Sequence, residues 1–218
     1  MVRIWILLFV LLALPRISYA SDFDKAIQII LKHEGKLVND KHDRGGITNY
    51  GVSLRYVEGL MKSGTVAISE FDFNRDGKVD GLDIADMNLD EAKAIYKKKW
   101  WNLYGYGKIN DQKIATKVFD LAVNMGNKKA VKIIQESCNM LAYSDNKRFK
   151  NVKNNIKIDG ILGKETVNFI NSLDEGYEKK LIAKIRVNAA NYYKYLAKKH
   201  PTYKKFLKGW LNRAFDKA

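Results

Sequence analysis

Glu34 is the residue whose position most directly suggests chemistry. It follows Phe23 by eleven positions on a predicted helix over about 22–34, on the face that carries the apolar Ile27 and Ile30. Burial and the negative end of a helix both disfavour a charged carboxylate, so we expect this side chain to hold a proton. A protonated carboxylic acid can donate that proton to the oxygen of a glycosidic bond. The alternative is a structural acid that reaches solvent or caps a neighbouring element.

The polar segment after this helix supplies candidates for a second catalytic group. Residues 36–51 are rich in Asn, Asp and Gly and contain a Gly-Gly turn signal, so we expect a short β-hairpin there. Asp43 could serve the positively charged sugar centre, and Thr48 could hold a water molecule. A helix-ending acid that faces such a hairpin is the arrangement of a lysozyme.

Residues 72–83 are a second polar segment, and their polar residues have the spacing of a calcium-binding loop. Oxygen ligands occupy positions 1, 3, 5, 9 and 12, a glycine occupies position 6, and position 7 would offer its backbone carbonyl. The loop ends in Asp rather than Glu, which is similar to dockerin-type loops. We expect structural Ca²⁺ here and no cofactor for the chemistry; the alternative is a surface loop held by Asx turns. The predicted ligands are Asp72, Asn74, Asp76, Lys78, Asp80 and Asp83.

The composition limits the classes of protein to be considered. The chain has 218 residues with a single Cys and three His, so neither a disulfide scaffold nor a zinc site of His and Cys is expected. There are 39 Lys and Arg residues against 24 Asp and Glu residues, a formal charge of +15. This excess favours an anionic partner.

Residues 1–20 have the pattern of a secretory signal peptide. Arg3 precedes eleven consecutive apolar residues, and residues 18–20 (Ser-Tyr-Ala) form a cleavage signature. The apolar run is shorter than the roughly 20 residues that span a bilayer, so a retained anchor is the weaker alternative. We expect an exported protein, periplasmic or secreted, with no stable membrane anchor after cleavage. Its anionic partners would then be wall polymers and not nucleic acid.

Apolar residues at helical spacing predict a mainly α chain. Capping boxes are expected to begin two helices, one with Ser21 and Asp24 and the other with Asn88 and Glu91. Residues 114–125 are apolar nearly all round, which predicts a buried central helix ended by the following glycine. Further helices are expected over about 52–61, 128–140, 164–173, 178–199 and 203–215.

Three stretches of the first half resemble glycoside hydrolase family 108. They read HEGK at 33–36 with DRGGITNYG at 43–51, AKAIYKKKWW at 92–101, and FDLAVNMG at 119–126. Members are lysozyme-like N-acetylmuramidases, so the resemblance implies a mainly α, lysozyme-like helical fold with a short β-hairpin region near 36–51. Lys36 departs from the family, which usually has a second glycine there.

The resemblance also implies roles for particular residues. Glu34 becomes the general acid and Asp43 the second carboxylate, while the third role stays open between Thr48 and Asn49. The gap after Asp43 is one residue shorter than in phage lysozymes with a Glu-Asp-Thr triad. The expected substrate-binding residues come from the same motifs and are Asn39, Asp40, Asn49, Tyr50 and Asn124.

A motif in the second half resembles peptidoglycan-binding domains. DGILGKET at 159–166 has their Asp-Gly-x-x-Gly-x-x-Thr pattern, although a plain helix-entry loop explains the local residues equally well. The expected organisation is a signal peptide over 1–20, a lysozyme-like catalytic domain over 21–126 with the calcium loop inserted, and a helical peptidoglycan-binding domain over 127–218.

These features predict an exported peptidoglycan hydrolase that binds glycan strands. It would cleave the β-1,4 bond between N-acetylmuramic acid and N-acetylglucosamine, with Glu34 as general acid. The first alternative is a non-catalytic module that binds the wall and assists secretion or a partner. A basic protein that disrupts membranes or binds nucleic acid ranks last, since no cationic segment has an apolar face that the core does not need. The sequence predicts no oligomeric state.

Overall fold

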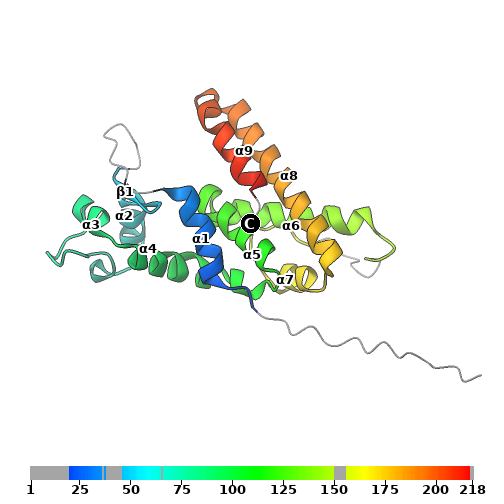
Figure 1. Cartoon of the computed structure of the whole chain (residues 1–218), viewed down its shortest axis with the longest axis horizontal. Helices are drawn as coiled ribbons and strands as arrows, with labels where there is room; N and C mark the ends of the chain where they lie inside the picture. The colour runs from blue at the N-terminus through cyan, green and yellow to red at the C-terminus, as the bar shows by residue number, and fades with distance from the viewer. Residues whose placement is uncertain (1–19, 36, 38–45, 65, 150–155, 217–218) are drawn as a thin grey trace, which may run out of the picture.

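The computed structural model describes residues 20–35, 37, 46–64, 66–149 and 156–216 (Figure 1). Within them the protein is mainly α-helical with a small antiparallel hairpin, as predicted. The α-helices are α1 (Phe23–Glu34), α2 (Leu54–Lys62), α3 (Gly81–Asp86), α4 (Leu89–Tyr96), α5 (Gln112–Met125), α6 (Asn127–Ser144), α7 (Lys164–Asn171), α8 (Glu175–Lys199) and α9 (Leu207–Phe215). The shorter helices are η1 (Ile68–Glu70), η2 (Lys97–Asn102, a π-helix), η3 (Tyr106–Lys108) and η4 (Pro201–Phe206).

The hairpin is formed by β1 (Thr48–Asn49) and β2 (Val52–Ser53), with Thr48 paired to Ser53. Tyr50 and Gly51 make the two-residue turn, and both have positive φ (49° and 80°). Positive φ at both positions is the requirement of a type I′ turn, whose twist matches that of the strands. The hairpin was expected near 36–51. It lies at the end of that range and continues two residues beyond it, while residues 36 and 38–45 lie outside the described part of the chain.

Local capping explains where the helices begin. Asn88 and Glu91 form the predicted capping box of α4, with the Asn88 amide donating to Glu91 at 2.7 Å. The predicted box at α1 is wrong, because the Ser21 hydroxyl donates to the buried carbonyl of Tyr106 (3.3 Å). Asp22 is therefore the N-cap, and its carboxylate accepts from two amides of the first turn.

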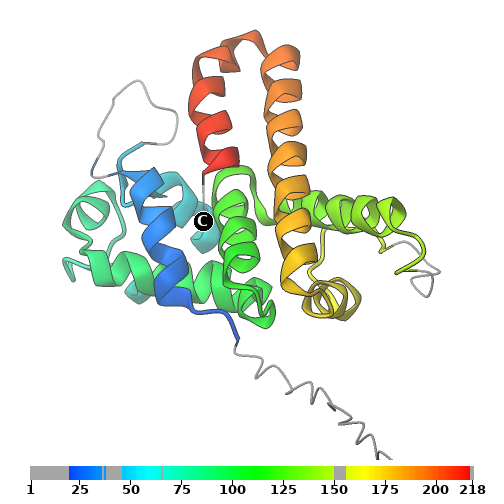
Figure 2. The same cartoon turned by 45° about the vertical axis from the view of Figure 1, so that its right-hand side comes forward.

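α5 lies in the middle of the molecule, with α1 on one side and α6 and α8 packed against it (Figures 1 and 2). Its burial on nearly all faces confirms the predicted central helix, and the glycine that follows has the φ of 86° expected at a helix end. Phe119 of α5 contacts rings from four other elements at centroid distances of 5.4–6.3 Å. These rings are Phe23, Tyr96, Trp101 and Tyr106.

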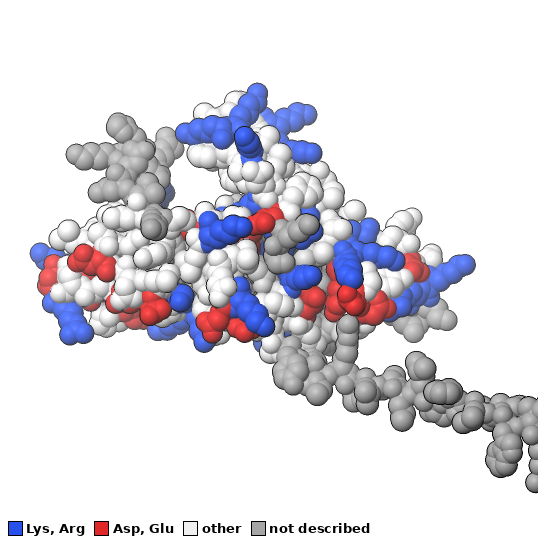
Figure 3. All heavy atoms as spheres, in the orientation of Figure 1, with Lys and Arg blue, Asp and Glu red and all other residues white. Residues whose placement is uncertain are grey.

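α8, η4 and α9 form a helical hairpin whose outer end extends away from the other helices (Figures 1 and 2). Pro201 follows α8 and opens η4, so the single helix predicted over 203–215 is a 3-10 segment joined to α9. Lys and Arg side chains surround this outer end (Figure 3). Across the described residues, no helix combines the length and the apolar character that a membrane span requires.

Candidate active site

Glu34 ends α1, and an arginine from the far end of the chain holds its carboxylate. Its Oε1 accepts a hydrogen bond from Nη2 of Arg213, on α9, at 2.6 Å. The Glu34 side chain is 19% exposed and the Arg213 side chain 8% exposed. The partial burial agrees with the apolar pattern of α1, whereas the ion pair with α9 was not predicted.

Arg213 also binds a second, fully buried carboxylate. Its Nε donates to Oδ1 of Asp120, on α5, at 2.9 Å, and its Nη2 donates to the Asp120 backbone carbonyl at 3.3 Å. Burial alone would lower the pKa of Arg213, but the charges of Asp120 and Glu34 outweigh it and raise that pKa. The guanidinium is therefore a fixed positive charge between α1, α5 and α9.

Lys117 completes this buried group one helical turn before Asp120. Its Nζ donates to the backbone carbonyl of Arg213 at 3.0 Å and lies 3.8 Å from Oδ2 of Asp120. Burial lowers the pKa of Lys117, although the nearby Asp120 opposes that shift. The three side chains anchor the end of α9 to α5 beneath Glu34.

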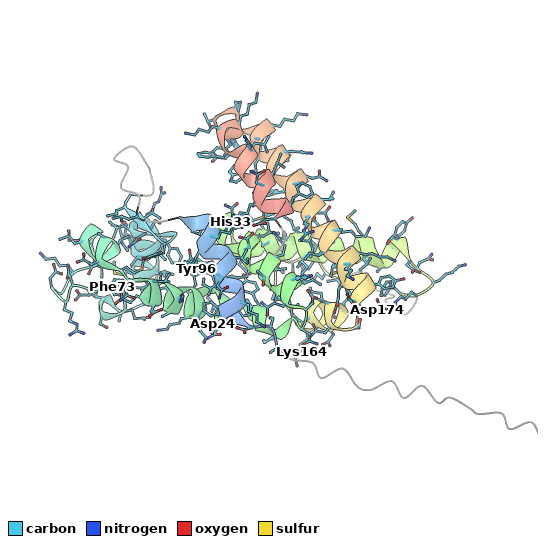
Figure 4. The ribbon with its side chains drawn as sticks, viewed as in Figure 1. Asp24, His33, Phe73, Tyr96, Lys164 and Asp174 are labelled. Atoms are coloured by element: carbon cyan, nitrogen blue, oxygen red, sulfur yellow. The ribbon has the colours of Figure 1, made fainter. Side chains whose placement is uncertain are left out.

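The turn of the β-hairpin lies against the Glu34 side chain. A Cβ at Gly51 would be 2.7 Å from Cβ and Cγ of Glu34 and 2.5 Å from Oη of Tyr96, so a side chain does not fit there. Tyr96, labelled beside α1 in Figure 4, donates to the Tyr50 carbonyl at 3.1 Å. Burial, and next the charge of Glu34, raise the pKa of Tyr96, which stays a neutral donor. The hairpin turn, Tyr96 and Arg213 thus fix the position of Glu34.

The two hairpin residues proposed for the third catalytic role are placed differently. Thr48 is half-buried, and its one hydrogen bond to a described residue is a long contact, 3.5 Å, from its hydroxyl to the Gly46 carbonyl. Asn49 is buried, and its amide donates to the carbonyls of Ala85 (3.3 Å) and Met87 (3.0 Å). Asn49 therefore attaches the hairpin to the end of α3, which leaves Thr48 better placed to hold a water molecule.

Other predicted site residues either join two helices or lie outside the described part of the chain. Asn39, Asp40 and Asp43 fall within 38–45 and lie outside the described residues. Asn124 accepts a hydrogen bond at 2.7 Å from the hydroxyl of Tyr193, a buried residue of α8. Burial raises the pKa of Tyr193, so it remains a donor, and Asn124 joins α5 to α8.

In the predicted calcium loop, the side chains accept hydrogen bonds from backbone amides of the same loop. The two carboxylate oxygens of the buried Asp83 each accept a loop amide at 2.8 Å, and those of Asp72 accept two more at 3.0 Å. Asn74, Asp76 and Asp80 each accept from the amide two residues ahead, as in Asx turns. In the part of the chain that the structure describes, no three His, Cys, Asp or Glu residues are grouped to hold a metal ion. The calcium site stays a prediction.

A single buried side chain of α6 binds both residues of the Asp-Gly pair in the motif at 159–166. Gln135 of α6, almost fully buried, donates to the Asp159 carboxylate (2.9 Å) and accepts from the Gly160 amide (2.9 Å). Gly160 has a φ of 83°, and a Cβ there would lie 2.7 Å from the Lys128 carbonyl. These contacts explain the Asp-Gly pair as a turn packed on α6 that leads into α7.

Residues 27–126 match the family model described as Glycosyl hydrolase 108. The first half of the chain is a glycosyl hydrolase 108 domain. Residues 129–215 match a second family model, described as a Predicted Peptidoglycan domain. The resemblance seen in the sequence is thereby confirmed, and the ion pair between Glu34 and Arg213 joins the glycosyl hydrolase 108 domain to the peptidoglycan domain.

The fold is similar to the solved structure of SagA from Brucella abortus. The two sequences are 21% identical, the match covers 88% of each chain, and the TM-score is 0.61. This likeness supports the lysozyme-like helical fold and says nothing of activity. A search of the curated proteins finds no match. Together the glycosyl hydrolase 108 domain and the peptidoglycan domain support a peptidoglycan hydrolase, and peptidoglycan lies outside the cytoplasm.

Proposed function

We propose that this protein is an exported N-acetylmuramidase with Glu34 as its general acid. It would cleave the β-1,4 bond between N-acetylmuramic acid and N-acetylglucosamine in peptidoglycan. The observation that carries the proposal is the placement of Glu34 at the end of α1, within the glycosyl hydrolase 108 domain and enclosed by the hairpin turn and Arg213. Export would follow from the signal peptide predicted over residues 1–20.

In this mechanism Glu34 protonates the oxygen that leaves with the departing sugar. A general acid must carry a proton, so Glu34 would hold that proton on its other carboxyl oxygen while Oε1 keeps the hydrogen bond from Arg213. When the proton has been transferred, Glu34 becomes negatively charged again and Arg213, already in place, stabilises that charge. Arg213 would therefore position the acid and favour its deprotonated product.

A second group must serve the oxocarbenium-like centre. A nucleophilic Asp43 would give retention of configuration, and a water molecule held by Thr48 would give inversion. Asn49 is the weaker choice because its amide already binds two backbone carbonyls. Substrate contacts from Asn39, Asp40, Tyr50 and Asn124, and structural Ca²⁺ in the 72–83 loop, are further parts of the proposal.

Aromatic side chains beside the acid support a carbohydrate substrate. Trp100 lies 5.2 Å from the ring of Tyr96 and 4.7 Å from the ring of Tyr56, measured between centroids. Trp100 and Tyr56 are both half-buried, so part of each ring is open to solvent. Such rings supply large apolar area with a polar edge, which suits the faces of sugar rings.

The products of peptidoglycan digestion test the proposed bond. Sacculi are digested with the purified protein, and the new reducing ends are identified by mass spectrometry. A muramidase leaves N-acetylmuramic acid at the reducing end. N-acetylglucosamine at that end would indicate a glucosaminidase, and a 1,6-anhydro sugar would indicate a lytic transglycosylase; either result contradicts the proposal.

One observation favours the alternative of a non-catalytic wall-binding module. Among the described residues, Glu34 accepts one hydrogen bond, from Arg213 to its Oε1. Such a contact is also what a purely structural ion pair would show. A zymogram on purified peptidoglycan separates the two functions, because a binding module would leave the substrate uncleared.

A further inference from the structure

The outer end of the α8–α9 hairpin carries a dense positive charge. Residues 194–210, called the hairpin tip here, contain six lysines and no acidic residue. The nearest acids in the sequence are Glu178 and Asp216, so no carboxylate of the hairpin itself neutralises the tip. All six lysines are exposed, and Figure 3 shows Lys and Arg side chains gathered around the projecting end. They are Lys194, Lys198, Lys199, Lys204, Lys205 and Lys208.

Aromatic side chains are exposed among these lysines. Tyr195, Tyr203 and Phe206 are 55%, 40% and 47% exposed. Tyr203, Phe206 and the half-buried Trp210 contact one another, at centroid distances of 5.8–6.5 Å. The three rings therefore form one partly exposed aromatic cluster among the lysines. Exposed aromatic rings of this kind are costly in water and indicate a contact surface.

We propose that the hairpin tip docks on an anionic phospholipid surface. Lysines near such a surface are attracted to its headgroups, and aromatic side chains among them enter the boundary between headgroups and acyl chains. A glycan strand fits the tip less well, because it has no boundary between headgroups and acyl chains for the exposed aromatic side chains to enter. Peptidoglycan carries carboxylates on its stem peptides, so its binding is measured separately in the test below.

The position of Arg213 links this surface to the candidate active site. Arg213 follows Phe206 by seven residues along α9, a distance of roughly 10 Å at the rise of an α-helix. Docking through the tip would therefore hold the Glu34–Arg213 pair close to the membrane. The wall layer next to the bilayer would be the part of the substrate within reach. The docking itself does not depend on the proposed muramidase activity.

Vesicle binding by the full chain tests the proposal. Co-sedimentation is measured with vesicles of phosphatidylcholine, with and without phosphatidylglycerol, and separately with insoluble peptidoglycan. The variants are Lys204→Gln with Lys205→Gln, and Phe206→Ser. The matched control is Lys25→Gln with Lys62→Gln, which removes the same charge from exposed positions outside the tip and outside the motif at 159–166; Asp24, next to Lys25, lies at the opposite side from the tip (Figure 4).

We expect binding that depends on phosphatidylglycerol and weakens about 30-fold in the double lysine variant. Phe206→Ser should also weaken it, while the control binds as the wild type and peptidoglycan binding is unchanged in all variants. The proposal is overturned if the wild type ignores phosphatidylglycerol, or if either tip variant binds vesicles as well as the control. If the tip variants lost peptidoglycan binding and the control did not, the tip would instead be a surface that binds the wall.

Discussion

The carboxylate of Glu34 and the guanidinium of Arg213 form an ion pair 2.6 Å long between residues 179 positions apart in the sequence. The pair joins the two domains through α1 and α9, and the same guanidinium binds the buried Asp120 of α5. The C-terminal helix is thus part of the candidate active site, and a wall-bound peptidoglycan domain is mechanically connected to the proposed acid.

Removing the guanidinium should cost both stability and activity. Arg213→Met leaves Asp120 buried and without its main partner, so we expect the free energy of unfolding to fall by about 3–5 kcal/mol. Arg213→Lys should retain more stability but lose lytic activity, because one ammonium cannot reproduce the fork that holds both carboxylates. Denaturant unfolding and clearing of peptidoglycan measure the two effects.

Arg148 provides the matched control, since it forms an exposed ion pair of similar length with Asp174 (2.7 Å). Arg148→Met should cost less than about 1 kcal/mol. If Arg213→Met were no more damaging than this control, the buried network would have no energetic importance.

Gly51→Ala should displace the proposed acid. The new Cβ would collide with Glu34 and with the Tyr96 hydroxyl, and the φ of 80° adds backbone strain of about 1–3 kcal/mol. We expect lytic activity to fall at least tenfold, on the order of the loss expected from small misplacements of a catalytic group. The control is Gly126→Ala, where φ is 86° but the added Cβ meets open space. Equal activity in the two variants would show that the hairpin turn does not position Glu34.

Glu70 should give a measurable pH dependence. Its hydrogen bond from Lys98 (2.6 Å), helped by Lys99, lowers its pKa from 4.5 to about 2. Because the folded state holds the ionised form more tightly than the unfolded state, this stabilisation is complete above pH 4.5. It is lost as the pH falls toward 2. The pair is partly exposed, so it contributes less than about 1 kcal/mol.

The measurement is the difference in unfolding free energy between the wild type and Glu70→Gln as a function of pH. The difference should be constant above pH 4.5 and should shrink below it. A difference that stayed the same under acid conditions would mean that the lysines do not stabilise the Glu70 carboxylate.

The loop at 72–83 should bind Ca²⁺ and gain stability from it. At free Ca²⁺ about 100-fold above its dissociation constant, binding adds about 2.7 kcal/mol to the free energy of unfolding. Asp72→Asn with Asp76→Asn should remove this gain, and Asp90→Asn, an exposed acid outside the loop, should not. Calorimetric titration without heat, together with an unchanged melting temperature, would exclude the site.

Features set by neighbouring residues were predictable from the sequence. The capping box of Asn88 and Glu91 and the apolar pattern of α5 depend on residues a few positions apart, and both are present. The cap of α1 was assigned to the wrong residue because Ser21 is engaged by Tyr106, 85 positions away. The buried pair of Lys117 and Asp120, two charges one turn apart in an apolar helix, was not predicted, and nothing local identified their distant partner Arg213.

The motif at 159–166 shows the same limit. Its Asp-Gly turn was predicted from residue types alone, yet the side chain that organises it, Gln135, lies 24 positions before Asp159. Partners at such separation depend on the packing of α6 against the loop, which no local pattern encodes. The roles of Asp43, Thr48 and the calcium ligands remain predictions.

The most direct test of the central claim compares Glu34→Gln with the wild type on purified peptidoglycan. The account predicts that the variant sediments with peptidoglycan as the wild type does but that its release of soluble fragments falls by about 10²–10⁴-fold, the contribution typical of a general acid. Glu136→Gln, at an exposed position of α6, serves as the control and should keep full activity. Fragment release by Glu34→Gln at the rate of this control would contradict the account.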